Sequence, residues 1–268
     1  MSNNSYVHGY SDREKRRLGE QADVLAGLLH HDTLYPPGER ILEAGCGVGA
    51  QTTILADRNP LAEFVSLDIS EASVTEARAG ARARGLRRVT FAVGDILDLP
   101  FPDHSFDHVF ICFVLEHLQK PLSALASLRR VLRDGGTLTA IEGDHGSAYF
   151  HPDSSAARRS IQCLIEVQAR KGGDALIGRK LYPILVEAGF QAPGVSPRMV
   201  YADAGRPDLA EGFTVKTFTA MVEGVREQAL DMGLVDEETW KAGIDALHRT
   251  AEGDGTFCYT FFKATAVK

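Results

Sequence analysis

The segment of residues 41–57 constrains the fold more than any other part of this 268-residue chain. It begins with a short apolar run, ILEA, and continues through a loop with glycine at alternate positions, Gly45, Gly47 and Gly49. A stretch of helical character, residues 51–57, follows. Glycine tolerates positive φ and has no side chain to obstruct a ligand. This order predicts a strand, a loop that approaches a bound nucleoside closely, and a helix N-terminus beside it.

The spacing of these glycines separates two kinds of nucleotide site. The pattern GxGxxG indicates a dinucleotide and its pyrophosphate. This chain has E-x-G-x-G-x-G instead, with Glu43 two residues before the first glycine. Asp68, about twenty residues beyond the loop, suits hydrogen bonding to ribose hydroxyls. Dehydrogenases use the same device, so Asp68 alone does not exclude a nicotinamide-dependent oxidoreductase.

Short apolar runs alternate with helical stretches through the first half of the chain. Helices are expected at residues 11–31, 72–84 and 122–132, and Ser11 and Glu14 form a capping box for the first. Such alternation predicts parallel strands, right-handed crossovers and helices on both faces. Beyond residue 142 longer helical patterns take over, at 154–171, 178–188, 209–230 and 236–251. The predicted strands cover residues 41–44, 64–68, 89–93, 107–112, 137–142, part of 190–201 and 256–267.

We therefore predict an α/β protein with a Rossmann-like, doubly wound, seven-stranded and mostly parallel sheet, a helical cap and an N-terminal helical lid. Residues 1–37 would form the lid region and residues 38–146 the nucleoside-binding core. Residues 147–177 would be a first cap insertion, and residues 178–204 would return to the core as a helix and a strand. The remaining predicted parts are cap helices at 205–254 and a last core strand at 255–268.

Composition limits the partners and the compartment. The formal net charge of −7 disfavours a general nucleic-acid binder, which needs a basic surface. The four cysteines show no CxxC spacing, which fits a reducing cytoplasm rather than a disulfide framework or a cysteine zinc site. The N-terminus is polar, and no apolar run is long enough to span a bilayer. We expect a cytoplasmic protein without membrane or nucleic-acid partners, and the cap helices could support a homodimer.

Several further motifs follow the glycine loop in a fixed order. They are LDIS at residues 67–70, VGDI at 93–96, LPFPDHSFD at 99–107, VFICFVLEHL at 109–118 and LRRVLRDGGTL at 128–138. Together with the loop, this series resembles the class I S-adenosylmethionine (SAM) dependent methyltransferases, and within them the UbiE-like, methyltransferase-11-type enzymes that act on small molecules. The resemblance covers residues 40–145 well and the rest of the chain loosely.

The resemblance implies a SAM site with named residues. The acid at the end of the second strand would bind ribose, and the acid after the third would lie near the adenine amino group, with an apolar neighbour on the ring. The implied cofactor-binding residues are Glu43, Gly45, Gly47, Gly49, Gln51, Asp68, Ile69, Asp95, Ile96, Cys112 and Phe113.

Plainer alternatives remain open for four of these motif residues. Glu43 could only cap the loop, although in the family it lies near the methionine amino end. Gln51 could be a surface residue, or could reach the cofactor carboxylate from a helix N-terminus. Cys112 could be core, or could present its backbone carbonyl to the methionine ammonium. His117, just beyond the fourth strand, is expected to orient a helix start.

An aromatic segment, residues 6–10, precedes the first predicted helix. It could be a frayed terminus. We favour a lid whose Tyr10 closes over the methionine or the substrate. The sequence YVHGYSDREKRRL also resembles a subgroup of bacterial small-molecule methyltransferases that includes indole C3-methyltransferases of natural-product biosynthesis.

Methyl transfer from a sulfonium is an in-line displacement, so the protein must hold the nucleophile in line and exclude water. Some acceptors also need a base. Because ligands bind at the carboxyl ends of the strands, Glu142 and His145, just past the fifth strand, are the candidates. Asp144 and His145 could instead cap a turn. A metal site from Asp144, His145 and His151 is conceivable, but the spacing does not indicate one, and no metal is expected.

The sequence thus predicts a SAM-dependent methyltransferase that acts on a small, aromatic or isoprenoid-like metabolite. Within this class we favour an indole or tryptophan-derived acceptor, methylated at carbon or nitrogen. Aromatic and methionine side chains in the cap support such a pocket, although at helical spacing they also suit an ordinary core. The alternatives are a methyltransferase for tRNA or protein, a nicotinamide-dependent oxidoreductase and a SAM-binding module without catalysis.

Overall fold

The computed structural model describes residues 21, 22 and 24–268. Residues 24–30 are helical, so the predicted first helix ends where expected. The proposed lid with Tyr10 and the capping box of Ser11 and Glu14 lie outside the described residues, and they stay predictions. In the described part of the chain, no helix is long and apolar enough to cross a membrane.

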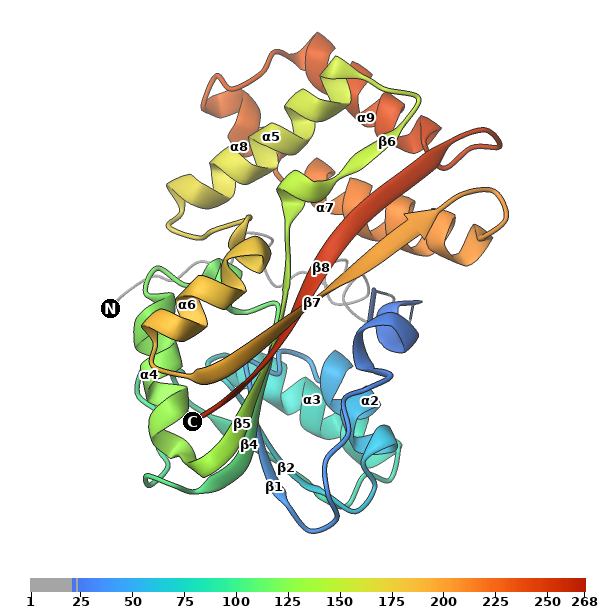
Figure 1. The fold of residues 1–268 in the computed structure, drawn as a ribbon. Coiled ribbons are helices and arrows are strands. Elements are labelled where there is room, and N and C mark those ends of the chain that lie inside the picture. The colour runs from blue at the N-terminus through green and yellow to red at the C-terminus, as the bar shows by residue number, and fades with distance from the viewer. Residues whose placement is uncertain (1–20, 23) are drawn as a thin grey trace.

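One twisted sheet organises the described residues (Figure 1). Its strands follow the order β3-β2-β1-β4-β5-β8-β6, and β7 also pairs with β8. The first five strands are parallel, whereas β8 runs antiparallel to β5, β6 and β7. The strands are β1 (Arg40–Ala44), β2 (Glu63–Asp68), β3 (Val89–Val93), β4 (Phe106–Cys112), β5 (Leu132–Gly143), β6 (Tyr149–His151), β7 (Gln191–Ala202) and β8 (Thr256–Val267).

The predicted α/β, doubly wound and mostly parallel architecture is confirmed, with one difference in strand number. We expected seven strands, and the described residues form an eight-stranded sheet. The additional strand is the three-residue β6, which pairs with the first residues of β8 inside the predicted cap insertion. A strand this short has no room for a readable alternation of apolar and polar residues, so its sequence carried no strand signal.

Helices cover both faces of the sheet. Helices α2 (Ala50–Arg58) and α3 (Glu71–Ala83) lie on one side in Figure 1, and α4 (Pro121–Val131) and α6 (Leu181–Glu187) on the other. Each turns its apolar positions inward. Helix α4, for example, buries Ala124, Leu125, Leu128 and Val131 at helical spacing. Short 3₁₀ helices follow β4 (Leu115–His117) and β5 (His145–Ser147), and a third (Ile177–Lys180) precedes α6.

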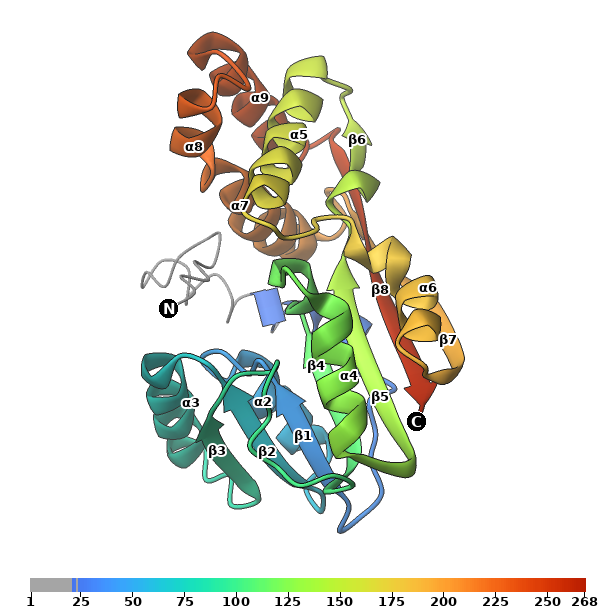
Figure 2. The ribbon, with the colours of Figure 1, turned by 90° about the vertical axis from the view of Figure 1, so that its left-hand side faces the viewer.

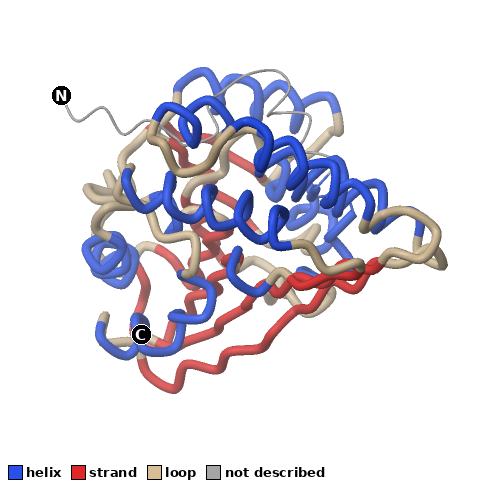
Figure 3. The backbone as a smooth tube through the Cα atoms, turned by 90° about the horizontal axis from the view of Figure 1, so that it is seen from above, coloured by secondary structure: helices blue, strands red, loops and turns tan. Residues whose placement is uncertain are grey.

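A second group of helices lies beyond the carboxyl end of β5 (Figure 2). It comprises α5 (Ser155–Arg170), a π-helical stretch (Leu209–Thr219), α7 (Ala220–Glu223), α8 (Arg226–Asp231) and α9 (Glu237–Arg249). In Figure 3, which is seen from above, helices lie over one side of the strands. Helices α5 and α9 approach closely at Gly243, where a Cβ would lie 2.2 Å from the Ser160 hydroxyl oxygen. We call this group the cap; the residue limits of the predicted domains stay predictions.

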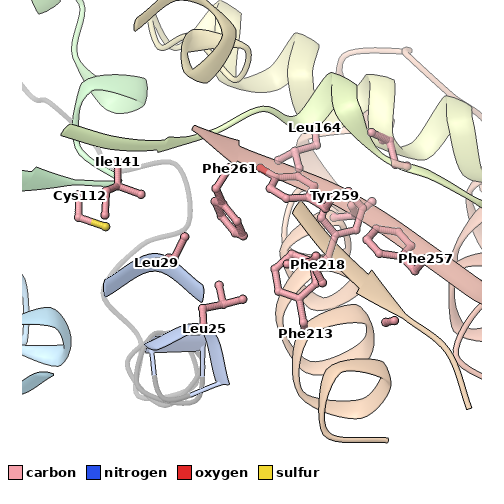
Figure 4. Close-up of a cluster of buried hydrophobic side chains, with 14 of the residues drawn as sticks. Leu25, Leu29, Cys112, Ile141, Leu164, Phe213, Phe218, Phe257, Tyr259 and Phe261 are labelled. Atoms are coloured by element: carbon pink, nitrogen blue, oxygen red, sulfur yellow. The ribbon is translucent and has the colours of Figure 1, made fainter. Parts of the chain in front are cut away.

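Two hydrophobic clusters fill the interior. One packs under α4 and α6 on one face of the sheet. The other includes Leu25 and Leu29 of the N-terminal helix, crosses the other face of the sheet, and continues into the cap. Figure 4 shows this continuity, with Phe261 of β8 between Leu29 and the cap aromatics Phe213 and Phe218. The apolar core on this second face of the sheet is therefore continuous with the core of the cap.

Candidate active site

The glycine loop joins β1 to α2 at the carboxyl edge of the sheet. Gly45, Gly47 and Gly49 all have positive φ, at 79°, 51° and 84°. A Cβ on Gly45 would lie 2.4 Å from a methyl group of Val114, so the loop accepts no side chain there. A Cβ on Gly47 would meet nothing within 4 Å, which leaves open space beside the loop. The backbone of the loop is therefore accessible at Gly47, and its close approach to a ligand stays a prediction from the glycine spacing.

Asp68, at the end of β2, holds the loop in place. Its Oδ2 accepts a hydrogen bond from the Gly47 N–H at 2.8 Å, and its Oδ1 accepts one from the Ser70 N–H at 2.9 Å. Ser70 in turn caps the N-terminus of α3. Each carboxylate oxygen can accept a second hydrogen bond. Asp68 can therefore fix the loop and still bind two ribose hydroxyls.

The adjacent apolar side chains divide into buried and exposed ones. Ile96, predicted to pack on the adenine ring, is buried in the core. Ile69 is 58% exposed and Leu97 is 41% exposed. Asp95 is exposed, and its Oδ1 accepts a hydrogen bond from the Leu97 N–H at 2.8 Å. Ile69 and Leu97 are thus the apolar side chains available to a planar base, and Leu97 is one that the sequence analysis missed.

Glu43 lies beneath the loop and is buried. Its Oε2 accepts hydrogen bonds from the hydroxyls of Thr52 in α2 and Ser66 in β2, each at 2.6 Å. Burial raises the pKa of the Glu43 carboxyl to about 7, against the opposing effect of the two hydroxyls. The carboxyl therefore ties β1, β2 and α2 together, which supports the capping alternative. Within the part of the chain that the structure describes, its Oε1 has no hydrogen-bond partner.

Gln51 lies in the first turn of α2, directly after the loop. Its Oε1 is 2.7 Å from Nε2 of His30, the last residue of the N-terminal helix. Burial lowers the pKa of His30 to about 4, so the imidazole is neutral near pH 7. The sequence analysis missed His30, because no local pattern connects two residues that are 21 positions apart.

Cys112 is the last residue of β4, and Phe113 follows it. The Cys112 side chain is buried. Phe113 has a φ of 58°, which is rare for an aromatic residue, and its N–H donates to the Ile141 carbonyl at 2.9 Å. Its ring lies 5.3 Å from that of Phe261, measured between centroids. Backbone held in this region of φ often marks a functional position.

Glu142, at the end of β5, is fully buried. Its Oε1 accepts hydrogen bonds from the Val114 and Leu115 N–H groups, at 3.1 and 2.8 Å. Burial, and next the nearby carboxylate of Glu116, raise the pKa of Glu142 well above its ordinary value. Its Oε2 has no hydrogen-bond partner in residues 21, 22 and 24–268. Because Val114 also contacts the glycine loop, Glu142 is linked to the cofactor side through a single residue.

His145 connects the end of β5 to the cap. Its Nδ1 is 2.8 Å from the Tyr259 hydroxyl, and its Nε2 is 3.6 Å from Oε2 of Glu116. Gln168 of α5 donates to the Glu116 carbonyl at 3.0 Å. All four side chains are buried, and the ring of His145 packs edge-on against that of Phe218. Sequence reasoning missed Glu116, Gln168 and Tyr259, which come from three distant segments.

Asp144 has a structural partner. Arg179 donates two hydrogen bonds to its carboxylate, at 2.6 and 2.7 Å, and the Gly146 N–H donates a third at 3.1 Å. These contacts agree with the turn-capping alternative for Asp144. Among residues 21, 22 and 24–268, no group of three or more histidine, cysteine, aspartate or glutamate side chains is placed to hold a metal ion.

The predicted site residues thus gather in two places. The glycine loop, Asp68, Asp95, Gln51 and Phe113 surround the carboxyl edge of β1–β4, whereas Glu142 and His145 lie between β5 and the cap. The loop, the ribose acid and the exposed apolar pair fit an adenosyl group and its amino-acid tail. Which of these residues contact the cofactor or an acceptor stays a prediction.

Comparison with known proteins places this arrangement in a family. A family model described as "Methyltransferase domain" matches residues 42–140. The chain is 31% identical over 229 residues to 27-O-demethylrifamycin SV methyltransferase of Amycolatopsis mediterranei, covering 83% of this chain and 76% of that protein. It is 34% identical over 145 residues to the ubiquinone/menaquinone biosynthesis C-methyltransferase UbiE of Paracoccus denitrificans, with 51% of this chain and 58% of that protein covered.

Another relative, an uncharacterized 37.1 kDa protein from a transposon of Streptomyces fradiae, is 36% identical over 191 residues, covering 70% of this chain and 54% of that protein. The chain thus spans a little over half the length of this relative and of UbiE.

Solved structures agree on the fold. The cyclase SpnF has a TM-score of 0.56 at 22% identity, with 93% of this chain and 81% of that one covered. A SAM-dependent methyltransferase from Aquifex aeolicus has a TM-score of 0.54 at 15% identity, with coverage of 97% and 100%. The fold and the glycine loop define a Rossmann-like methyltransferase. The chain belongs to the class I SAM-dependent methyltransferases, in the methyltransferase-domain family that includes UbiE.

Proposed function

We propose that this protein transfers a methyl group from SAM to a small, aromatic metabolite. The observation that carries the proposal is the loop of Gly45, Gly47 and Gly49 fixed by the Asp68 carboxylate at the carboxyl edge of β1 and β2. Asp68 would bind the ribose, Ile69 and Leu97 would enclose the adenine with Asp95 near its amino group, and the loop would lie along the methionine. SAM supplies the activated methyl group.

The acceptor would bind between this edge and the cap. The sulfonium needs no further activation, so the protein mainly orients the acceptor and excludes water. We assign the proton acceptor to the buried group of Glu142 and His145, with Tyr10 as a candidate to close the site. The raised pKa of Glu142 supports this role, because a carboxylate with a raised pKa is a stronger base than an ordinary one.

Small molecules are the favoured acceptors for two reasons. The relatives include a quinone-biosynthesis C-methyltransferase, a demethylrifamycin methyltransferase and ajmaline N-methyltransferase of Rauvolfia serpentina, which is 31% identical over 137 residues. The aromatic side chains of the cap also suit a planar ligand. Within this class we propose an indole or tryptophan-derived acceptor, methylated at carbon or nitrogen. Transfer to tRNA or protein is the competing outcome.

Cofactor binding is tested by isothermal titration calorimetry with SAM and S-adenosylhomocysteine. Asp68→Ala removes the anchor of the loop and the ribose acceptor, and we expect affinity to fall about 100-fold, in line with the loss of two charge-assisted hydrogen bonds. Asp231→Ala, which removes an exposed acid of α8, is the matched control and should bind normally. Unchanged binding by Asp68→Ala would refute the proposed site.

The acceptor is tested by transfer of a labelled methyl group. Indole and tryptophan are offered in parallel with bulk tRNA and with a protein extract. Label in the small molecules supports the proposal, and mass spectrometry then locates the methylated atom. Label confined to RNA or to protein would overturn it and favour a macromolecular methyltransferase.

A further inference from the structure

His30 and Gln51 form a contact between the N-terminal helix and the start of α2 that no motif of the chain foretells. The His30 side chain is fully buried and packs 5.7 Å from the ring of Phe110, measured between centroids. Its Nε2 bonds to the Gln51 amide oxygen at 2.7 Å, whereas its Nδ1 is buried and has no hydrogen-bond partner among the described residues. Burying one imidazole nitrogen without a hydrogen-bond partner has a free-energy cost, so this arrangement of His30 is unusual.

The hydrogen bond to His30 holds the glutamine side chain in one orientation. Burial lowers the pKa of His30 to about 4, so the ring carries one N–H near pH 7. With the Gln51 oxygen as the acceptor, that proton is on Nε2. The Gln51 amide group, with two N–H donors, is then turned away from His30. Among the described residues no hydrogen bond from this amide nitrogen is formed.

The two N–H donors of the Gln51 amide lie where they can bind an anion. It is in the first turn of α2, and Gly49, the residue before that helix, supplies no side-chain cap. The first N–H groups of the helix are therefore left for another acceptor, and the positive end of the helix dipole favours a negative charge. The amino-acid carboxylate of SAM is the anion that the proposed function brings to this loop.

Lys263 of β8 holds His30 in position. Its buried ammonium donates to the Leu29 carbonyl at 3.2 Å, to the Thr33 hydroxyl at 2.6 Å and to Asp32 at 2.6 Å. Asp32 also pairs with Arg198 of β7. These contacts fix the residues on both sides of His30, so the imidazole has little freedom to turn away from Gln51.

We propose that His30 is a positioning residue for the cofactor carboxylate: it locks the Gln51 amide with its N–H donors facing the methionine end of SAM. The inference rests on the proposed function and adds a residue that acts through Gln51. It predicts discrimination between ligands that differ in the amino-acid tail, because the adenosyl part of SAM is bound elsewhere, by Asp68 and its neighbours.

The test compares S-adenosylhomocysteine with 5′-methylthioadenosine, which lacks the amino-acid carboxylate, by titration calorimetry on the full chain. His30→Leu should weaken S-adenosylhomocysteine about tenfold, the usual effect of one lost hydrogen bond to a charged group, and leave methylthioadenosine unchanged. His30→Gln, which returns an N–H near the position of Nε2, should restore most of the affinity. The exposed neighbour gives the control His31→Leu, which should bind both ligands normally.

A double-mutant cycle separates positioning from mere packing. Gln51→Leu should lose the same affinity as His30→Leu, and the double variant should lose no more than either single one. Equal losses for both ligands, losses that add in the double variant, or no loss in His30→Leu would overturn the inference while the proposed function stands. Failure of the unmodified protein to bind S-adenosylhomocysteine would instead refute both. Thermal unfolding of each variant identifies any that fail to fold.

Discussion

The carboxyl edge of β1–β4 and the junction between β5 and the cap are built in different ways. At the first, backbone N–H groups and glycines form the surface, and the Asp68 carboxylate accepts hydrogen bonds from both Gly47 and Ser70. At the second, four side chains from three segments, Glu116, Glu142 with His145, and Tyr259, meet in a buried cluster against aromatic rings. The first side is built locally, and the second is assembled from distant parts of the chain.

This difference shows which parts of the sequence determine each of the two regions. A backbone cradle depends on glycine and one acid, so it tolerates changes elsewhere and remains recognisable in the sequence. A cluster of buried side chains depends on the packing of the cap, so changes far from it in the chain can alter it. We therefore expect changes in the cap to alter stability and the acceptor site together, and to leave cofactor affinity largely intact.

The largest effect is expected from Phe218→Ala. Phe218 is buried among Phe257, Tyr259 and the ring of His145. Its truncation leaves a cavity and should lower the free energy of unfolding by about 4 kcal/mol, measured by urea denaturation. Tyr182→Ala, at an exposed ring on α6, should change it by less than about 0.5 kcal/mol. A small effect at Phe218 would mean that the cap is not part of the same cooperative core.

A second, pH-dependent effect is expected from Glu43 under the glycine loop. Its pKa is about 7 in the folded protein and 4.5 ordinarily, so the folded state holds a proton that the unfolded state releases. This contribution is fully present below pH 4.5 and is lost as pH rises to about 7, a difference of roughly 3 kcal/mol.

Glu43→Gln keeps the acceptor oxygen for Thr52 and Ser66 and cannot ionise. Urea denaturation of both proteins between pH 4.5 and 7.5 should therefore show a stability gap that shifts in favour of the variant as pH rises. A gap that stays constant over this range would show that Glu43 ionises normally in the folded protein.

The smallest effect is expected from Tyr259→Phe. The change removes only the hydroxyl that bonds to His145 Nδ1, so the free energy of unfolding should fall by about 1 kcal/mol. SAM affinity, measured by calorimetry, should be unchanged, because Tyr259 belongs to the cap side. A clear loss of SAM affinity would show that the two regions are coupled more tightly than their contacts indicate.

Much of the fold could be predicted because its signals are local. The apolar runs before Gly45, Asp68 and Cys112 define strands by themselves, and the helical periodicities between them imply parallel pairing. Strand β6 was not predicted because three residues carry no periodicity. Strand β5 begins at Leu132, the last residue of the helix predicted at 122–132, and not at residue 137. There, pairing with β4 outweighs the local preference of the sequence.

The residues of the candidate site likewise differ in whether a local sequence signal reveals them. The residues of the loop were predictable, since Gly47 and Asp68 meet through one strand connection. The partners His30, Glu116 and Tyr259 were not, because each joins its neighbour across a long stretch of chain and has no spacing to reveal it. Ile96 was predicted for the adenine surface by its place beside Asp95, and this stays a prediction; the structure buries Ile96 and exposes its neighbour Leu97.

The anchor of His30 has a consequence for the order in which the chain becomes functional. Lys263 bonds to Leu29, Asp32 and Thr33, which lie 230 or more positions earlier in the chain. During synthesis, the contacts of His30 with Gln51 and Phe110 can form before β8 leaves the ribosome, whereas the contacts of Lys263 cannot. The residues on both sides of His30 therefore gain their last contacts near the end of synthesis. A nascent chain that stops before residue 263 would contain the glycine loop but lack the Lys263 contacts that hold His30 beside Gln51.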